Sequence, residues 1–222
     1  MKKILIFLFC FLTYATPTIA LVEIDITRGN LDPLPIAVSP LYVDPESEEI
    51  KQDDITIKNI GEEISKVIEV NFKRSGLFNP LKKDSFVQKP DIAHLKPRFE
   101  DWRLIKAQAL VTGKVTVSNN KLRAEFRLWD VVAAKEMVAL AFSTTPKNWR
   151  RIAHIISDKI YERLTGEKGY FDTRIIYVAE SGPKTQRYKK LAIMDQDGAN
   201  VKYLTLGNEL VLTPRFSPKN QL

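Results

Sequence analysis

The sequence ALVTGKVTVSNNKLRAEFRLWD, residues 109–130, decides the fold that we predict for this chain. Residues 109–117 have the composition of a strand, and Ser118-Asn119-Asn120 supplies a tight hairpin turn. In residues 122–129, apolar side chains alternate with Arg, Glu or Trp, which indicates a second strand with one buried and one solvated face. Residues 137–144 supply a third strand. Together these segments predict an antiparallel meander.

Two helices flank the meander in the sequence. From residue 57 the apolar period becomes 3.6, and a second helix follows Thr145-Pro146 and ends at Gly166. The first helix is predicted to bury Ile57, Ile60, Ile64, Val67, Ile68 and Asn71, and the second Trp149, Ile152, Ala153, Ile156, Ile160 and Leu164.

The ends and the charged side of the first helix also follow from the sequence. We expect Asp53 or Asp54 to cap its start and Gly76 to end it. Its charges are expected to form two i,i+4 pairs, Glu62 with Lys66 and Glu69 with Lys73.

An earlier apolar run completes the predicted domain. Residues 34–41 suit a strand that is buried on both faces, with its prolines at an end or an edge. Residues 81–97 are rich in Lys and Pro and are expected to be loop with short elements. The order of strands and helices predicts an α+β domain, residues 21–169, with both helices on one face of a mixed sheet.

The sequence changes character after Gly169. Short strands are predicted at residues 174–180, 188–194 and 201–206, with Asp195-Gln196-Asp197-Gly198 as a hairpin turn. Such strands are typical of β-propeller blades, so residues 170–222 are expected to hold the first blade and the start of a second. Because so short a segment cannot close a ring, we expect an incomplete propeller and a C-terminally truncated chain.

Composition and the N-terminus narrow the class of protein. The chain has 222 residues, 44% of them hydrophobic and 27% charged, with a formal net charge of +7, which disfavours wholesale disorder and a polytopic membrane protein. Lys2 and Lys3 precede an apolar run that closes at Ala20, which predicts a signal peptide over residues 1–20, cleavage after Ala20 and a periplasmic location. Cys10 is the only cysteine. No later segment is apolar and long enough to span a bilayer, so we expect no stable membrane insertion after cleavage.

Motifs for catalysis, cofactors and metals are missing from the sequence. It has no Gly-x-Ser-x-Gly elbow, dinucleotide-binding loop or Walker A loop, so we predict no enzyme activity and no cofactor. His94 and His154 are the only histidines, and helical geometry places His154 in solvent beside Asp158 and Tyr161, so no metal site is expected. The Asp195 turn would place Leu204 where a calcium loop needs a Glu. The dispersed positive charge also disfavours nucleic-acid binding.

The best candidate for partner binding is the start of the mature chain, where apolar and polar residues alternate with a period of two. One interpretation is the first strand of the sheet, and the other is a free segment that adds to the edge of a partner. The residues concerned are Leu21, Val22, Glu23, Ile24, Asp25, Ile26 and Thr27.

Five segments in this order resemble the TolB family of the Tol-Pal system along essentially the whole mature chain. The first three are residues 35–40, residues 74–80, and Trp102 with residues 110–115. The most specific is the run from Trp149 to Ile175, which includes Leu-Thr-Gly-Glu-Lys-Gly-Tyr-Phe-Asp-Thr-Arg-Ile. The fifth is residues 195–200.

The resemblance implies a periplasmic adaptor that links the inner-membrane protein TolA to the outer-membrane lipoprotein Pal and supports envelope integrity and outer-membrane invagination at cell division. It implies that residues 21–27 contact TolA, with free and tucked states in competition, and that the propeller contacts Pal, which a truncated propeller puts in question. Two alternatives stay open: a fragment of an exported propeller-containing hydrolase, and a stand-alone periplasmic binding module.

Overall fold

The computed structural model describes residues 22–24, 32–52, 55–57, 59–207 and 211–217. Its main sheet has the order β5-β1-β6-β7-β8, and β2 also pairs with β6. β1 is parallel to β5, and both β1 and β2 are parallel to β6, whereas β6, β7 and β8 form the predicted antiparallel meander. The strands are β1 (Leu34–Val38), β2 (Tyr42–Val43), β5 (Phe78–Pro80), β6 (Ala109–Ser118), β7 (Lys121–Asp130) and β8 (Lys135–Thr144).

The hairpin at the centre of the prediction has the expected register. Ser118 pairs with Lys121 across a two-residue loop, and Asn119 and Asn120 both adopt positive φ, at 51° and 55°. Asn tolerates this left-handed conformation better than most residues, and two such residues give the turn whose twist matches the strands. Burial alternates along β7, as predicted.

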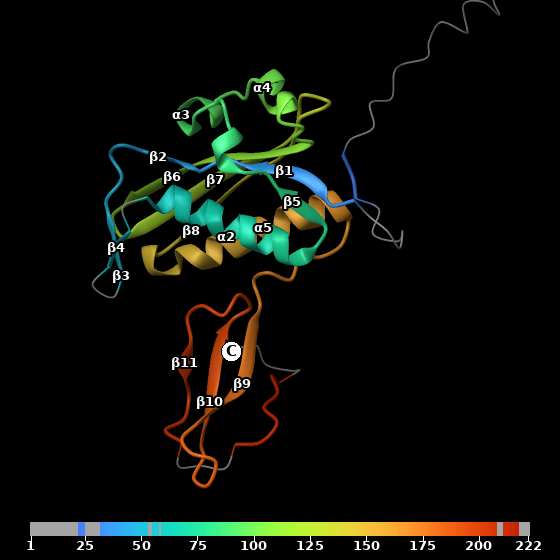
Figure 1. The fold of residues 1–222 in the computed structure, drawn as a ribbon. Coiled ribbons are helices and arrows are strands. Elements are labelled where there is room, and N and C mark those ends of the chain that lie inside the picture. The colour runs from blue at the N-terminus through green and yellow to red at the C-terminus, as the bar shows by residue number, and fades with distance from the viewer. Residues whose placement is uncertain (1–21, 25–31, 53–54, 58, 208–210, 218–222) are drawn as a thin grey trace, which may run out of the picture.

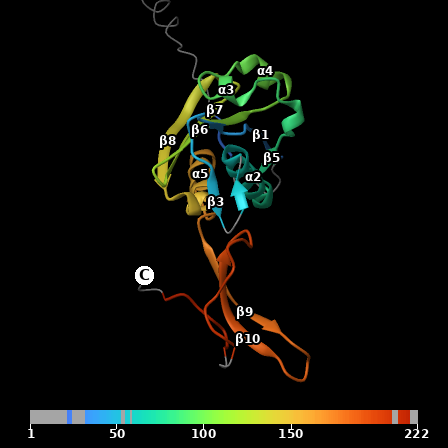
Figure 2. The same ribbon diagram turned by 90° about the vertical axis from the view of Figure 1, so that its left-hand side faces the viewer.

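Two long helices cover one face of the sheet, α2 (Ile60–Ser75) and α5 (Trp149–Thr165), as Figures 1 and 2 show. Two short helices, α3 (Pro90–Ala93) and α4 (Phe99–Leu104), lie over the other face, where Trp102 is buried in a smaller core. The 3₁₀ turns η1 (Lys83–Ser85) and η2 (Pro146–Asn148) lie in the connections. A mixed sheet with both long helices on one face confirms the predicted α+β class.

The start of α2 and one of its ion pairs differ from the prediction. Ile57 lies in a small hairpin of β3 (Ile50–Gln52) and β4 (Ile55–Ile57), so the helix begins after it. The cap is Asn59, whose side chain accepts from the N–H of Glu62, while Asp53 and Asp54 lie outside the described residues. An amide oxygen one residue before the helix satisfies a free N–H that the more distant aspartates would not reach.

At the other end of α2, Gly76 adopts φ 73° and ends the helix as predicted. The pair of Lys66 with Glu62 is also confirmed, at 3.5 Å. Glu69 instead pairs with Lys83 at 3.2 Å, because the chain after β5 returns η1 to the side of the helix.

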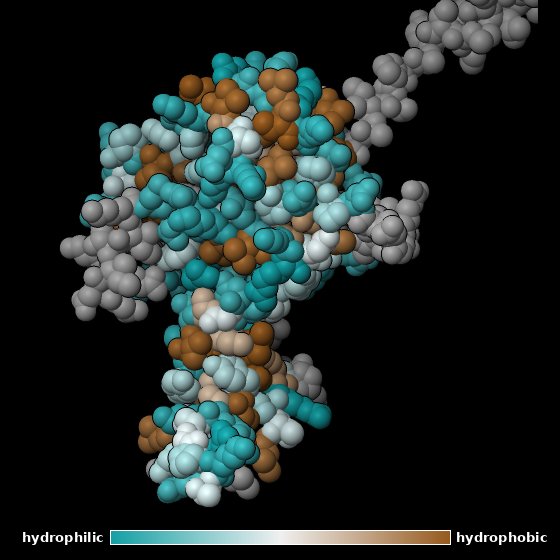
Figure 3. Space-filling view, viewed as in Figure 1, coloured by the Kyte–Doolittle hydropathy of each residue, from teal (hydrophilic) through white to brown (hydrophobic). Residues whose placement is uncertain are grey.

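A second, three-stranded sheet follows α5 and lies beyond the helical layer (Figure 1). Its antiparallel strands are β9 (Arg174–Ser181), β10 (Tyr188–Asp195) and β11 (Lys202–Tyr203). The third strand is shorter than residues 201–206, the predicted range. Exposed apolar side chains lie on this sheet and on the chain that flanks β11 (Figure 3), and they include Ile175 of β9 and the flanking Val201, Leu204 and Leu206. No helix within the described ranges is both long and apolar enough to span a bilayer.

Candidate functional site

The described part of the predicted partner-binding segment is Val22, Glu23 and Ile24. The N–H of Val22 donates to Oδ2 of Asp130 at 2.9 Å, and the N–H of Ile24 donates to the carbonyl of Leu164 at 2.6 Å. Ile24 is 9% exposed and belongs to the main core, whereas Glu23 is exposed. These three residues pair with no described strand. The remaining residues of the segment, Leu21, Asp25, Ile26 and Thr27, lie outside the described residues.

The docking of these three residues is close to energetic balance. Burying the Ile24 side chain contributes about 1.5–3 kcal/mol, and two main-chain hydrogen bonds add about 0.5–1.5 kcal/mol each. Ordering three backbone residues costs about 1–2 kcal/mol each, which offsets most of that gain. A segment held in this way can leave its own domain at small cost.

A second candidate site lies where the turn between β10 and β11 meets the two long helices. The Asn71 side chain, fully buried on α2, donates through Nδ2 to Oγ of Ser157 at 2.9 Å and lies 3.0 Å from Nδ1 of His154. Its Oδ1 accepts from Nε2 of Gln196 in the turn at 2.9 Å. One amide therefore joins α2, α5 and the second sheet. We call the cluster of Asn71, Arg150, His154, Ser157, Gln196 and Asp197 the polar junction.

The prediction that His154 lies in solvent is wrong. Its side chain is buried, because the β10–β11 turn covers a side of α5 that the helical period alone assigns to solvent. With Asn71 donating to Nδ1, the proton of the neutral imidazole lies on Nε2, which faces Oδ2 of Asp197 at 3.6 Å. Burial lowers the pKa of His154, although Asp197 and Asp195 oppose the shift.

Asp197 is the acidic centre of the junction. Its carboxylate forms an ion pair with the guanidinium of Arg150 on α5. Burial raises the pKa of Asp197, but the N–H of Ala199, the Arg150 charge and His154 together outweigh burial and hold the pKa below its usual value. Arg74 adds a hydrogen bond to the carbonyl of Gln196 at 2.8 Å.

The connection from α5 into β9 is fixed by Asp158. Its carboxylate accepts from the N–H of Phe171 at 2.6 Å and of Asp172 at 3.1 Å. A Cβ on Gly169 would lie 2.4 Å from Cα of Asp158, so only glycine allows this close approach. Asp172 in turn pairs with Arg151 of α5 at 3.1 Å. Asp158 and Arg151 of the helix therefore both hold the connection just before β9.

Among the described residues, one group of side chains at and beside the junction could ligate a cation. Ligand atoms of His154, Asp195 and Asp197 lie within 4.8 Å of one another. However, the Arg150 guanidinium already neutralises Asp197. Nε2 of His154 carries the imidazole proton and so has no free lone pair for a metal ion. The chemistry of the donors therefore fits a structural ion-pair network better than a metal centre.

One signal in the sequence could have revealed the junction. Arg150, His154 and Asp158 lie four residues apart, a polar stripe along one side of α5, and each contacts the second sheet or its connection. A stripe of mixed charge that has no apolar residues can mark a face covered by another polar surface. The period of apolar residues alone does not detect it.

Known proteins resemble this chain along most of its length. Residues 22–137 match the family model of the TolB amino-terminal domain, and residues 161–222 match that of the TolB beta propeller domain. The Tol-Pal system protein TolB of Pelagibacter ubique is 71% identical over 203 residues, which are 91% of this chain and 46% of that protein. The crystal structure of TolB from Acinetobacter baumannii is 23% identical and superimposes with a TM-score of 0.61 over 78% of this chain and 38% of that one. This chain thus spans about half the length of the curated relative.

Proposed function

This chain belongs to the TolB family, and on that premise we propose that it is a non-enzymatic adaptor of the Tol-Pal system in the periplasm. In this proposal, cleavage after Ala20 frees the segment Leu21–Thr27 to bind a TolA-like inner-membrane protein. The second sheet begins the propeller that contacts a Pal-like lipoprotein. The adaptor thereby supports envelope integrity and the inward movement of the outer membrane at division. Membership of the TolB family favours the adaptor hypothesis over the hypothesis of an exported hydrolase fragment.

The observation that carries the proposal is the weak docking of the N-terminal segment. Val22 and Ile24 form main-chain hydrogen bonds with a side chain and a helix end rather than with a strand. Exchange of these contacts for a strand of a partner would replace two hydrogen bonds with a longer ladder, which offsets the loss of the Ile24 and Val22 packing against the core. Residues with alternating polarity suit such a ladder because one face can be buried while the other stays in water.

The test is a calorimetric titration of the chain that begins at Leu21 with the purified periplasmic domain of TolA. Deletion of residues 21–27 is expected to abolish binding. A matched control deletes residues 211–217, which lie beyond the second sheet, and is expected to keep the affinity within about twofold. Unchanged affinity after deletion of residues 21–27 would sink the assignment of this segment.

A second variant tests competition between the docked and released states. Asp130→Asn weakens the acceptor for the Val22 N–H, and so it is expected to raise the affinity for the TolA domain by about two- to tenfold, because less docking must be undone. Asp130 also accepts from the N–H of Ala133 at 2.8 Å, so the unfolding midpoint of the variant is measured alongside. A folded variant with lower affinity would contradict the competition.

A further inference from the structure

The two edges of the main sheet are protected to very different degrees. β5 forms one edge with three residues and includes Pro80. β8 forms the other with ten residues, and within the described part of the chain no strand pairs with its outer side (Figure 2). Residues 137–144 of β8, MVALAFST, contain no charge, proline or glycine. Proteins normally protect a long edge with such residues, so this edge is available for pairing.

The register shows which main-chain groups of β8 point outward. Because the β6–β7 hairpin has a two-residue loop, Ser118 and Lys121 are a hydrogen-bonded pair, and every second residue of β7 from Lys121 onward bonds to β6. The intervening residues, such as Ala124 and Phe126, bond to β8. On β8 the N–H and C=O groups that face away from β7 therefore belong to Ala139, Ala141 and Ser143.

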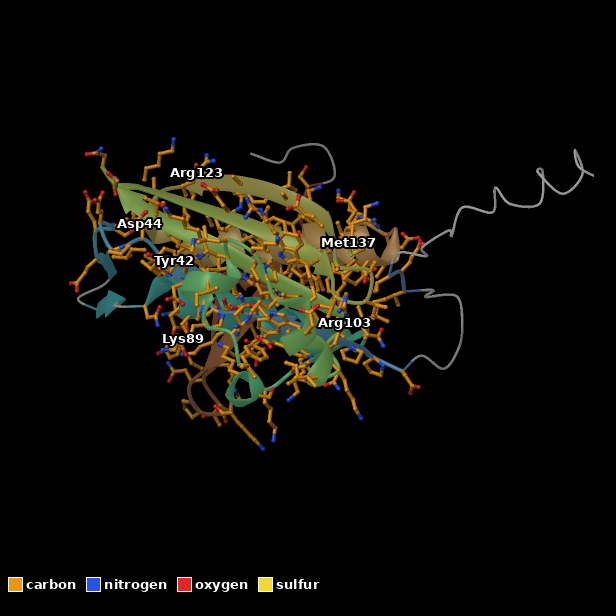
Figure 4. The ribbon with its side chains drawn as sticks, turned by 90° about the horizontal axis from the view of Figure 1, so that it is seen from above. Tyr42, Asp44, Lys89, Arg103, Arg123 and Met137 are labelled. Carbon is orange, nitrogen blue, oxygen red and sulfur yellow. The ribbon has the colours of Figure 1, made fainter. Side chains whose placement is uncertain are left out.

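A hollow lies on each side of this edge. The one on the face of α3 has a volume of about 390 Å³, with Ala139 and Ala141 in its lining and the exposed Leu95 at its rim. The one on the face of α5 has a volume of about 380 Å³ and is lined by Val138 and Leu140 of β8 and by residues of α5. Figure 4 shows the sheet from above, with Met137 of β8 and Arg123 of the neighbouring β7 labelled. A strand added to β8 would direct alternate side chains toward the two hollows.

The charges in these hollows indicate the chemistry of the added strand. Arg127 pairs with Glu136 at 3.3 Å, and Lys159 pairs with Glu162 at 2.8 Å, so these cations are neutralised. Arg163, in the hollow beside α5, forms no ion pair among the described residues, although Glu23 and Glu162 line the same hollow. The small side chains of β8 leave room for branched apolar residues, and Arg163 is complementary to a carboxylate.

We propose that the β8 edge binds an extended segment of a partner protein as an additional strand, in which branched apolar residues alternate with polar ones and one acidic residue faces Arg163. Glu23 of the segment Leu21–Thr27 also lines the hollow beside α5, so this surface adjoins that segment, and the chain would both donate a strand at its N-terminus and accept one at β8. The proposal does not depend on the identity of the TolA partner.

The test uses a fluorescein-labelled heptapeptide, acetyl-Thr-Val-Thr-Val-Glu-Val-Thr-amide, and fluorescence anisotropy with the full chain. Ala141→Pro removes an outward N–H that the fold does not use, so the variant is expected to fold and to bind the peptide at least about tenfold more weakly. The matched control Ala141→Ser keeps the N–H and is expected to stay within about twofold of the parent chain. Equal binding by the Pro variant would overturn the proposal.

Two further measurements make the result independent of the folding of one variant. A heptapeptide N-methylated at alternate residues cannot form the ladder, and it is expected to bind the unaltered chain at least about tenfold more weakly than the parent peptide. Arg163→Gln is expected to weaken binding of the Glu peptide but not of its Gln analogue. Absence of binding by the parent peptide would refute the proposal, and a concentration-dependent dimer that Ala141→Pro abolishes would assign the edge to a second copy instead.

Discussion

Replacing Asn71 by leucine tests whether the polar junction joins the two sheets. Leucine has the same branched shape as asparagine and no polar atom, but its methyl groups are bulkier, so Asn71→Leu removes the contacts and slightly overpacks this buried position instead of leaving a cavity. The buried amide contacts His154 at 3.0 Å, Ser157 at 2.9 Å and Gln196 at 2.9 Å. All three are lost together in the variant.

The loss of stability depends on whether each former partner of Asn71 can form another hydrogen bond. Nδ1 of His154 is left buried without a donor, which costs about 1–3 kcal/mol. Ser157 still donates to the carbonyl of Ala153 at 2.8 Å and stays satisfied. Gln196 is only half-buried and can turn to water, so its lost bond costs about 0.5–1.5 kcal/mol. The free energy of unfolding should fall by about 2–4 kcal/mol, which for a chain of this size corresponds to a Tm lower by about 4–16 °C.

The assay is urea denaturation followed by far-UV circular dichroism, with a thermal scan on the same samples. Asn79→Leu is the matched control, because Asn79 is exposed on β5 and its change is expected to stay within about 0.5 kcal/mol. A change of less than about 0.5 kcal/mol for Asn71→Leu would refute the reasoning, since a buried amide with three partners would then contribute nothing.

Three other predictions concern the junction and its surroundings. Because burial lowers the pKa of His154 in the folded chain, the unfolded chain binds the proton more readily, so stability should fall as pH drops below about 6.5. His154→Gln should flatten this slope in urea midpoints between about pH 7 and 5, and an unchanged slope would contradict the assignment. Gly169→Ala forces a Cβ against the backbone of Asp158 and should lower stability by about 1–3 kcal/mol in the same assay, whereas Ala in place of the exposed Glu167 should not. Arg150→Met should leave Asp197 buried without its cation and speed proteolytic cleavage between α5 and the second sheet; an unchanged cleavage rate would count against the ion pair.

Much of the fold could be predicted because its signals are local. The alternation along residues 122–129 fixes which face of β7 is buried, and the left-handed conformation of Asn119 and Asn120 fixes the register of the hairpin. The ends of both long helices at Gly76 and Gly166 follow from the φ values that glycine permits. Each of these features depends on a few neighbouring residues.

The errors occurred where distant segments meet. The burial of His154 depends on a turn more than forty residues later in the chain, as the separation of 47 residues between Arg150 and Asp197 illustrates. The partner of Glu69 is set by the return of η1 to the helix rather than by spacing along the helix. The helical period predicts the buried side of a helix that packs against one surface, whereas α5 lies between the main sheet and the β10–β11 turn. Val22 and Ile24 were proposed as partner-binding residues from their alternating pattern, but the acceptors of their N–H groups could not be predicted from it.

The most direct test of the adaptor proposal is a photocrosslink from Glu23, the exposed residue between the two docked positions. A photoreactive amino acid replaces Glu23 in the chain that begins at Leu21, and the purified periplasmic domain of TolA is added before irradiation. The proposal predicts a covalent product of the two proteins, and excess peptide spanning residues 21–27 should suppress it. Crosslinks confined to the chain itself, with none to the TolA domain at concentrations well above the binding constant, would contradict the proposal.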